Sequence, residues 1–191
     1  MKLLTFIFIF FYSYTGNIFA ELFNASEFRL KNGLKVIVVE NDRAPIVSQM
    51  IWYNVGSVDE EYGKSGLAHF LEHLMFKGTT KFPNGYFSKY ISKNGGSENA
   101  FTSFDYTAYY QIIPSDKVEK IIELESDRMR NLTLTKEQVE TEKKVILEER
   151  YQRIDSSPSA ILDESMRKSL FPNHAYGTPI IGWEHEIESL D

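Results

Sequence analysis

The sequence predicts an α+β fold, in which a mainly antiparallel sheet packs against helices. Runs rich in β-branched and aromatic residues follow one another along the chain, separated by amphipathic stretches with helix-capping residues. Sequential strands joined in this way favour an α+β domain over a doubly wound parallel sheet. The chain has 191 residues, 42% hydrophobic and 25% charged, which is enough for one domain or most of one. This composition excludes a disordered tail, a collagen and a pure coiled coil.

The predicted strands begin with a hairpin. Two β-rich runs flank Asn32-Gly33, a dipeptide that accepts the positive φ of a tight turn. Another β-rich run follows, and a later one, rich in Thr, Tyr, Phe and Ile, is closed by Pro114. These predicted strands cover residues 28–31, 34–39, 46–55 and 102–113.

Four helices are predicted between and after these strands. Ser65 can cap the start of the first helix, and Gly78 can end it. Thr135 and Gln138 form a capping box at the start of the last and longest helix. The predicted helices cover residues 66–77, 84–93 and 115–131 and the stretch that starts at Thr135. One side of the third helix is expected to carry Val118, Ile121, Ile122, Glu125 and Met129.

The N-terminus has the pattern of a secretory signal peptide. Lys2 supplies a positive charge, residues 3–14 are almost continuously apolar, and the small Ala20 precedes the polar Glu21. The alternative is an uncleaved membrane anchor, but the apolar run is shorter than the roughly 20 residues that span a bilayer, and no basic run follows it. We therefore expect cleavage of residues 1–20, a periplasmic or secreted protein, and one mature domain of residues 21–191 without a stable membrane span.

Charge and cysteine content narrow the possible functions. The chain has 21 Lys and Arg against 27 Asp and Glu, a net charge of −6, which disfavours nucleic acid as a partner because such binding depends on a basic surface. Cysteine is absent, which excludes a disulfide scaffold, a thiolate nucleophile and a Cys-based zinc site. Any metal must therefore be held by His, Asp or Glu. A chain without free thiols also suits an oxidising compartment.

The chemistry is concentrated in His69, Glu72 and His73. Two histidines four residues apart on a helix lie about 5–6 Å apart on one face, so both imidazoles can reach one tetrahedral zinc ion. Glu72 flanks this face and could accept a proton from a water on the metal without being a ligand. That placement would have no purpose in a purely structural zinc module. Two surface histidines beside a solvated glutamate are a poorer explanation, since the chain has only 4 histidines and two fall in this frame.

The long helix offers candidates for a third metal ligand. A catalytic zinc takes three protein ligands and leaves one position for water, whereas a structural zinc takes four. Glu142 and Glu149 share a helical stripe with the apolar Ile146. A carboxylate on such a stripe is costly unless it is paired or bound to a cation. The residues alone leave both a metal ligand and an internal ion pair open, the latter for example with Arg150 or Arg153.

Four segments resemble the inverzincin metallopeptidases of the pitrilysin, insulin-degrading enzyme and mitochondrial processing peptidase family. The signature of that family is an inverted zincin motif, His-x-x-Glu-His, with a glutamate ligand much further along the chain. The resembling segments are residues 56–60, 66–79, 95–102 and 142–149.

The resemblance implies roles for individual residues. Glu149 matches the third zinc ligand, which joins His69 and His73. Glu72 matches the general base, and Glu142 matches a second glutamate that supports the catalytic centre from outside the ligand set. A further stretch matches the family's substrate-binding edge strand, and its residues are Asn99, Ala100, Phe101 and Thr102.

The implied function is the N-terminal catalytic portion of a zinc-dependent metalloendopeptidase with one Zn²⁺ per chain. Its fold would be like the N-terminal half of a processing-peptidase-type metallohydrolase, incomplete at the C-terminus. Peptides or unfolded proteins would be the substrates, and a second family half or subunit would close the chamber. The alternative is a non-catalytic or truncated partner or scaffold subunit. Such subunits typically lose His or Glu from the metal motif, whereas this chain keeps them all, which favours the enzyme.

Overall fold

The computed structural model describes residues 25–190. The predicted signal peptide, residues 1–20, lies outside this range. The chain divides into two compact units, one that ends at Ala44 and one that begins at Pro45, and each is described by itself. Within residues 25–190, no helix is both long enough and apolar enough to cross a membrane.

The first unit contains the predicted hairpin. Strand β1 (Ala25–Arg29) pairs antiparallel with β2 (Lys35–Val39), and Arg29 lies opposite Lys35. The connection is longer than the predicted two-residue turn. The backbone N–H of Leu30 donates to the carbonyl of Leu34, and that of Gly33 donates to the carbonyl of Leu30. The Asn32 side chain also accepts a hydrogen bond from the backbone N–H of Leu34. Only the glycine of Asn32-Gly33 takes a positive φ, of 91°.

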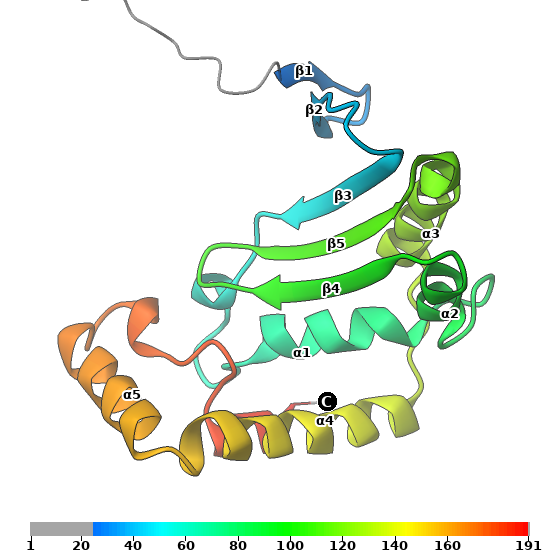
Figure 1. Ribbon diagram of the computed structural model, residues 1–191. Helices are drawn as coiled ribbons and strands as arrows, with labels where there is room; N and C mark the ends of the chain where they lie inside the picture. The colour runs from blue at the N-terminus through cyan, green and yellow to red at the C-terminus, as the bar shows by residue number, and fades with distance from the viewer. Residues whose placement is uncertain (1–24, 191) are drawn as a thin grey trace, which may run out of the picture. The chain divides into compact units, whose positions relative to one another are not determined.

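The second unit is built on a three-stranded antiparallel sheet, which confirms the predicted fold class (Figure 1). Its strands are β3 (Ile46–Tyr53), β4 (Ser97–Thr102) and β5 (Thr107–Pro114), in the order β3-β5-β4.

The prediction of one strand over residues 102–113 is wrong, because the chain reverses within it. Thr102 lies opposite Thr107, and the backbone N–H of Ser103 donates to the carbonyl of Tyr106. This turn contains neither Gly nor Pro, the strongest turn signals, and its turn-favouring residues Ser103 and Asp105 alternate with the aromatic Phe104 and Tyr106. Both strands retain the β-rich character that the sequence indicated.

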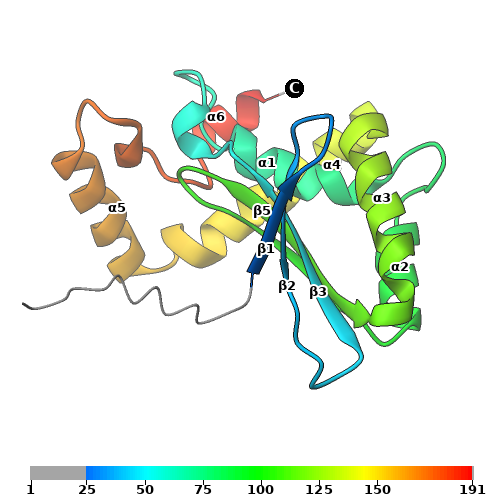
Figure 2. The same ribbon diagram turned by 90° about the horizontal axis from the view of Figure 1, so that it is seen from above.

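Six α-helices accompany this sheet within residues 25–190, and the long predicted ones are all present. They are α1 (Leu67–Leu74), α2 (Tyr86–Lys93), α3 (Val118–Asn131), α4 (Lys136–Arg150), α5 (Pro158–Leu170) and α6 (Glu184–Ser189). Short 3₁₀ turns follow α1 (Met75–Lys77) and precede α3 (Ser115–Lys117), and a π-helical turn, Tyr151–Asp155, follows α4. Helices α2 and α3 lie at one end of the sheet, as Figure 2 shows from above.

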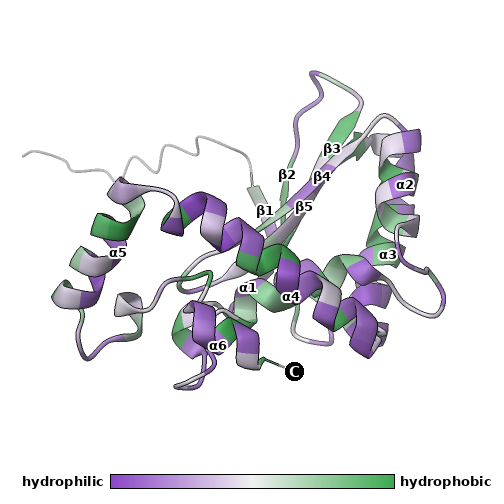
Figure 3. Ribbon diagram, turned by 90° about the horizontal axis from the view of Figure 1, so that it is seen from below, coloured by the Kyte–Doolittle hydropathy of each residue, from purple (hydrophilic) through white to green (hydrophobic). Residues whose placement is uncertain are grey.

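Two hydrophobic clusters hold these elements together. One joins α1 to α4 through Phe70, Leu74 and Ile146. The other packs Ile91 of α2 and Ile121 of α3 against the sheet. Each fully buried aliphatic side chain of this kind stabilises the fold by about 1.5–3 kcal/mol relative to an exposed one. Figure 3 shows that α4 is otherwise mostly hydrophilic, so a narrow apolar stripe fixes it on α1.

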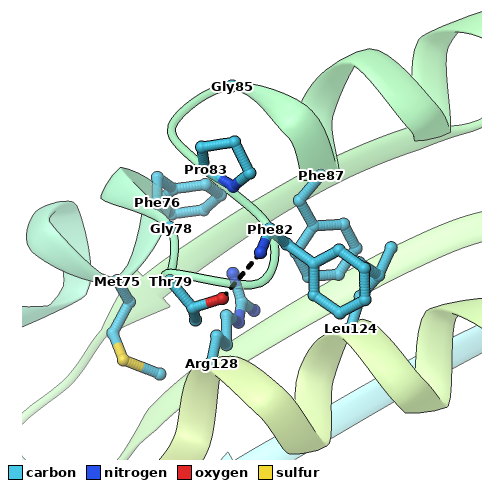
Figure 4. Close-up of a pocket in the computed structure, with 10 residues that line it drawn as sticks. All are labelled: Met75, Phe76, Gly78, Thr79, Phe82, Pro83, Gly85, Phe87, Leu124 and Arg128. Carbon is cyan, nitrogen blue, oxygen red and sulfur yellow. Dashed lines mark hydrogen bonds between the residues drawn. The ribbon is translucent and has the colours of Figure 1, made fainter. Parts of the chain in front are cut away.

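A small pocket beside the second cluster is lined mainly by apolar and aromatic side chains (Figure 4). Thr79 lies at its centre and accepts a hydrogen bond from the backbone N–H of Phe82. Arg128 closes one wall. None of the histidines or glutamates singled out by the sequence lines it, so this pocket is not the candidate functional site.

Two local predictions need correction. Ser65 does not cap α1, because its hydroxyl accepts from the backbone N–H of Trp183. The carboxylate of Glu60 takes the capping role, accepting from the N–H groups of Gly66 and Ala68 at 3.0 and 2.8 Å. In α4, by contrast, the Thr135–Gln138 capping box is confirmed.

The buried side of α3 is also rotated from the predicted one. Ile121 and Glu125 are buried as expected, together with Leu124 and Arg128, but Ile122 and Met129 are exposed. The predicted set contains Glu125 and four apolar residues but not Arg128. In the structure, Arg128 pairs with Glu125 one helical turn earlier and is buried with it.

Candidate metal centre

The structure brings His69, His73 and Glu149 together. Both histidines lie on one face of α1, and Glu149 lies one residue before the end of α4, which runs beside α1 (Figure 1). Glu149 Oε2 is 3.7 Å from His69 Nε2 and 3.3 Å from His73 Nε2. One ligand atom from each residue lies within 4.8 Å of the other two.

The donor atoms suit a small tetrahedral cation. Zinc binds imidazole nitrogen at about 2.0–2.1 Å and carboxylate oxygen at about 2.0–2.2 Å, so neighbouring donors around it are roughly 3.2–3.6 Å apart. The 3.3 Å distance from Glu149 to His73 falls in this range, and the 3.7 Å distance from Glu149 to His69 lies just above it. Two imidazoles and one carboxylate also leave a fourth position open, as in catalytic zinc sites.

Burial and hydrogen bonds shift the pKa of each of the three side chains. Burial, together with the neighbouring His73, lowers the pKa of His69 to about 4, so this imidazole is neutral at physiological pH. Burial also acts to lower the pKa of His73, but the hydrogen bonds to Glu149 and Glu142 outweigh it and raise that pKa. The hydrogen bond with His73 lowers the pKa of Glu149, which is therefore an anionic donor.

Glu72 is held beside the three donors but is not one of them. It lies on the side of α1 that faces β4, and the Thr102 hydroxyl donates to its Oε2. Burial raises the pKa of Glu72, and the hydrogen bond from Thr102 opposes that shift. Thr102, which the resemblance assigned to substrate binding, thus directs its side chain toward the predicted base.

Glu142 contacts the far side of the histidine pair. Its Oε1 accepts a hydrogen bond from His73 Nδ1 at 2.9 Å, and its Oε2 contacts Lys77 Nζ. Burial acts to raise the pKa of Glu142, but the contacts with Lys77 and His73 outweigh it and lower that pKa.

The ion-pair alternative for the long helix therefore holds in part, with one unexpected partner and one expected partner. Glu142 pairs with Lys77 instead of Arg150 or Arg153. Glu149 does pair with Arg153, through Oε1 at 2.8 Å, while its Oε2 faces the histidines.

The predicted substrate strand, β4, lies at an edge of its sheet, because the strand order ends with it. Ala100 and Thr102 lie on the inner side, and Asn99 and Phe101 on the exposed side. The backbone N–H of Ala100 donates to Asn99 Oδ1 at 2.9 Å. The Asn99 side chain thus takes up the backbone N–H of Ala100 on a strand that pairs with β5 alone.

Sequence reasoning missed the contacts of three residues at or near the ends of α1 and α4. They are Lys77, which pairs with Glu142, Glu60, which caps α1, and Arg150, which donates to the carbonyl of Gly182 at 2.8 Å. Lys77 is the only basic residue between His73 and Gly78, an observable signal, but periodicity cannot pair it with a glutamate on another helix. Arg150 was considered only as a partner for glutamates of its own helix.

Most of the chain, including the residues of this centre, matches a known protein family. Residues 35–184 match the family model for insulinase, peptidase family M16. The chain belongs to the insulinase peptidase family. The resemblance to pitrilysin-type metallopeptidases is thereby confirmed.

Curated relatives share this region. The chain is 37% identical over 161 residues to the zinc protease PqqE of Helicobacter pylori, which covers 84% of the chain and 36% of that protein. It is 33% identical to the mitochondrial-processing peptidase subunit beta of Blastocladiella emersonii, covering 85% of the chain and 35% of that subunit. The chain of this insulinase-family member therefore spans a little over one third of these relatives.

Solved structures confirm the fold. A protease from Helicobacter pylori superposes with a TM-score of 0.80 at 35% identity, covering 88% of this chain and 41% of that one. The periplasmic protease PqqL from Escherichia coli gives a TM-score of 0.78 at 25% identity, covering 87% of this chain and 19% of that one. The α+β fold is therefore that of part of an insulinase-family peptidase.

Proposed function

We propose that this chain, over residues 21–191, is the metal-binding catalytic portion of a zinc-dependent metalloendopeptidase. One observation carries the proposal: three donor atoms from α1 and α4 converge within 4.8 Å, while Glu72 is held beside them by Thr102. Relatives named zinc proteases support zinc as the metal, with His69, His73 and Glu149 as its ligands and one ion per chain.

A zinc ion bound there would lower the pKa of a water in its open position and polarise the carbonyl of the substrate. Glu72 accepts the proton of the attacking water and returns it to the leaving amine. Thr102 holds the carboxylate of Glu72 in one orientation. Burial raises the pKa of Glu72, which brings that carboxylate nearer the range in which a general base works at neutral pH.

Glu142 serves the same reaction without touching the metal. By accepting the Nδ1 proton of His73, it fixes the tautomer of that ring and directs Nε2 toward Glu149. We therefore place Glu142 among the residues on which catalysis depends, as a positioning group.

The substrate is an extended peptide or an unfolded protein, bound along β4 at Asn99, Ala100, Phe101 and Thr102. A strand with one sheet neighbour can pair with a peptide through main-chain hydrogen bonds. The Ala100 N–H that donates to Asn99 becomes available to a substrate carbonyl when the Asn99 side chain rotates away. This mode of binding selects extension more than sequence.

We further propose that a second family half or subunit closes the chamber, and that the protein acts in the periplasm or outside the cell. The short coverage of both relatives and solved structures supports the need for a second half. The N-terminal signal pattern supports export, as does the similarity to the periplasmic protease PqqL.

Metal analysis and peptide cleavage test the proposal together. The purified chain should contain one zinc per molecule by mass spectrometry. Together with a complementary family half, it should cleave a quenched fluorescent peptide in a way that a chelator abolishes and zinc restores. The second candidate function, a non-catalytic partner or scaffold, is favoured by the partial coverage of the relatives. It would be supported if zinc is bound but no cleavage appears even when a complementary family half is added.

A further inference from the structure

Lys77 forms an unusually buried lysine ion pair. Its side chain is 21% exposed and that of its partner Glu142 is 9% exposed. It is the only lysine ion pair within residues 25–190 in which both side chains are less than one quarter exposed. Burying two charges is costly, so a pair in this position needs an explanation beyond surface electrostatics.

The pair leads directly to a metal ligand. Lys77 Nζ contacts one oxygen of Glu142, and the other oxygen accepts from His73 Nδ1 at 2.9 Å. The opposite nitrogen of that ring, Nε2, is 3.3 Å from Glu149. A carboxylate with each oxygen engaged by a different donor cannot rotate freely, so Lys77 fixes the direction from which Glu142 approaches the ring.

The backbone presents Lys77 from a fixed position. It ends the 3₁₀ turn that continues α1, the helix that carries both histidines. The next residue, Gly78, has a φ of 89°, and a Cβ there would lie 2.5 Å from the carbonyl oxygen of Phe82. This close approach allows only glycine and holds the turn against the following loop. The ammonium group therefore has a set path to α4.

We propose that Lys77 is a positioning residue for the metal ligand His73 and acts through Glu142. The inference rests on the proposed function of this site as a zinc centre. A structural role alone would make Lys77 contribute to the packing of α1 on α4, and its removal would change the stability of the metal-free protein without changing zinc affinity. The positioning role requires a change in zinc affinity that depends on Glu142.

A double-mutant cycle on the full chain separates these roles. Zinc affinity is measured by competition with a chromophoric chelator, and folding of each metal-free variant is checked by circular dichroism. Lys77→Met should weaken zinc binding by about 10-fold, at the lower end of the range for groups that orient a ligand. Lys77→Arg should stay within about threefold of wild type, because it keeps a charged donor.

The second arm removes the intermediary. In a Glu142→Gln background, Lys77→Met should change zinc affinity by less than about twofold, because the route to His73 is already broken. Lys81→Met is the matched control, since Lys81 pairs with Glu123 in an exposed position and contacts none of the three donors. If Lys77→Met does not fold, Lys77→Gln replaces it in both backgrounds.

The outcomes distinguish this inference from the function on which it rests. Wild-type zinc affinity in Lys77→Met, or an equal loss with and without Glu142→Gln, overturns the role of Lys77 and leaves the zinc site intact. If the wild-type chain binds no zinc, or His73→Ala binds it equally well, the proposed function fails and this inference fails with it.

Discussion

Two buried clusters of charged side chains within residues 25–190 differ in whether their arrangement can bind a metal ion. In the first, His69, His73 and Glu149 direct donor atoms toward a common position between α1 and α4. In the second, Arg128 donates to both oxygens of Glu125 at 2.8 and 2.6 Å, and Gln111 donates to the same carboxylate.

The second cluster is the more deeply buried of the two. The side chains of Arg128 and Glu125 are each 3% exposed, and the guanidinium group lies 4.4 Å from the centre of the Tyr109 ring. The positive charge of Arg128 is paired with the negative charge of Glu125. In the metal centre, the side chains of His73 and Glu149 are 21% and 18% exposed, so solvent and substrate can reach them. Burial of charge alone does not mark a functional site; convergent donors with an approach from solvent do.

The largest expected effect is on metal binding by His73→Ala. Removing one of three ligands should abolish stoichiometric zinc binding, because two protein donors cannot hold the ion at micromolar concentration. The fold should persist, since the hydrophobic contacts between α1 and α4 remain. His185→Ala, which changes a distant exposed histidine, should bind one zinc. Equal zinc content in the two variants by mass spectrometry would contradict the ligand assignment.

Glu72→Gln should separate binding from chemistry. The amide keeps the shape of the side chain but cannot act as a base, so peptide hydrolysis should fall by about 10²–10⁴-fold. Zinc content should match wild type, because Glu72 is outside the group of donors. The rate is measured with a quenched peptide in a preparation that cleaves it, with the exposed Glu119→Gln as control. Unchanged turnover would show that Glu72 is not the general base.

Arg128→Met should destabilise the fold without changing the metal centre. Removing one partner of a buried ion pair leaves Glu125 uncompensated and should lower the free energy of unfolding by about 3–5 kcal/mol. Urea unfolding in the presence of a chelator measures this loss, and the exposed Arg130→Met is the control. Zinc affinity of the folded fraction should be unchanged. A loss of zinc affinity without a loss of stability would show that the two clusters are coupled.

Ala100→Pro tests the edge strand. Proline removes the Ala100 N–H, which donates to the Asn99 side chain, so the loss should weaken peptide binding by roughly 10-fold. Zinc content and melting temperature should stay close to wild type. Peptide affinity is measured in a Glu72→Gln background, which does not turn over the substrate. Wild-type affinity would place the peptide elsewhere, and unfolding would show that this position of β4 does not accommodate proline.

The smallest effect concerns the carboxylate that caps α1. Burial raises the pKa of Glu60 to about 7, against the hydrogen bonds from Ala68 and Gly66 and with a further contribution from Glu186. The folded protein thus binds this proton more tightly than the unfolded chain, for which the pKa is about 4.5. The contribution of Glu60 to the free energy of unfolding must then decrease as pH rises from about 4.5 to about 7.

Glu60→Gln removes this titration. The free energy of unfolding should then change between pH 4.5 and pH 7 by about 1 kcal/mol less than in wild type, after allowance for solvent screening. Urea unfolding of the metal-free protein at a series of pH values measures the difference, with Glu61→Gln as an exposed control. A variant that loses stability equally at pH 5 and pH 7 would show that Glu60 acts only as a cap.

The sequence by itself determined the features that depend on local spacing. His69 and His73 share a face because the helical repeat places residues four apart above one another. The Thr135–Gln138 capping box involves groups three residues apart, and it forms as predicted. Glu149 was suggested by a charged position on an apolar stripe and by the resemblance to the family, and the structure places it at the histidines.

Only the tertiary structure decided the contacts between distant segments. Lys77 reaches Glu142, and Glu60 displaces Ser65 as the cap of α1, because the packing of whole elements brings these groups together. The reversal at residues 103–106 depends on pairing of β4 with β5, and the side of α3 that is buried depends on where Arg128 finds Glu125. Such contacts have no period along the chain. Each depends on how two elements are placed relative to one another, and the local sequence of either element does not specify that placement.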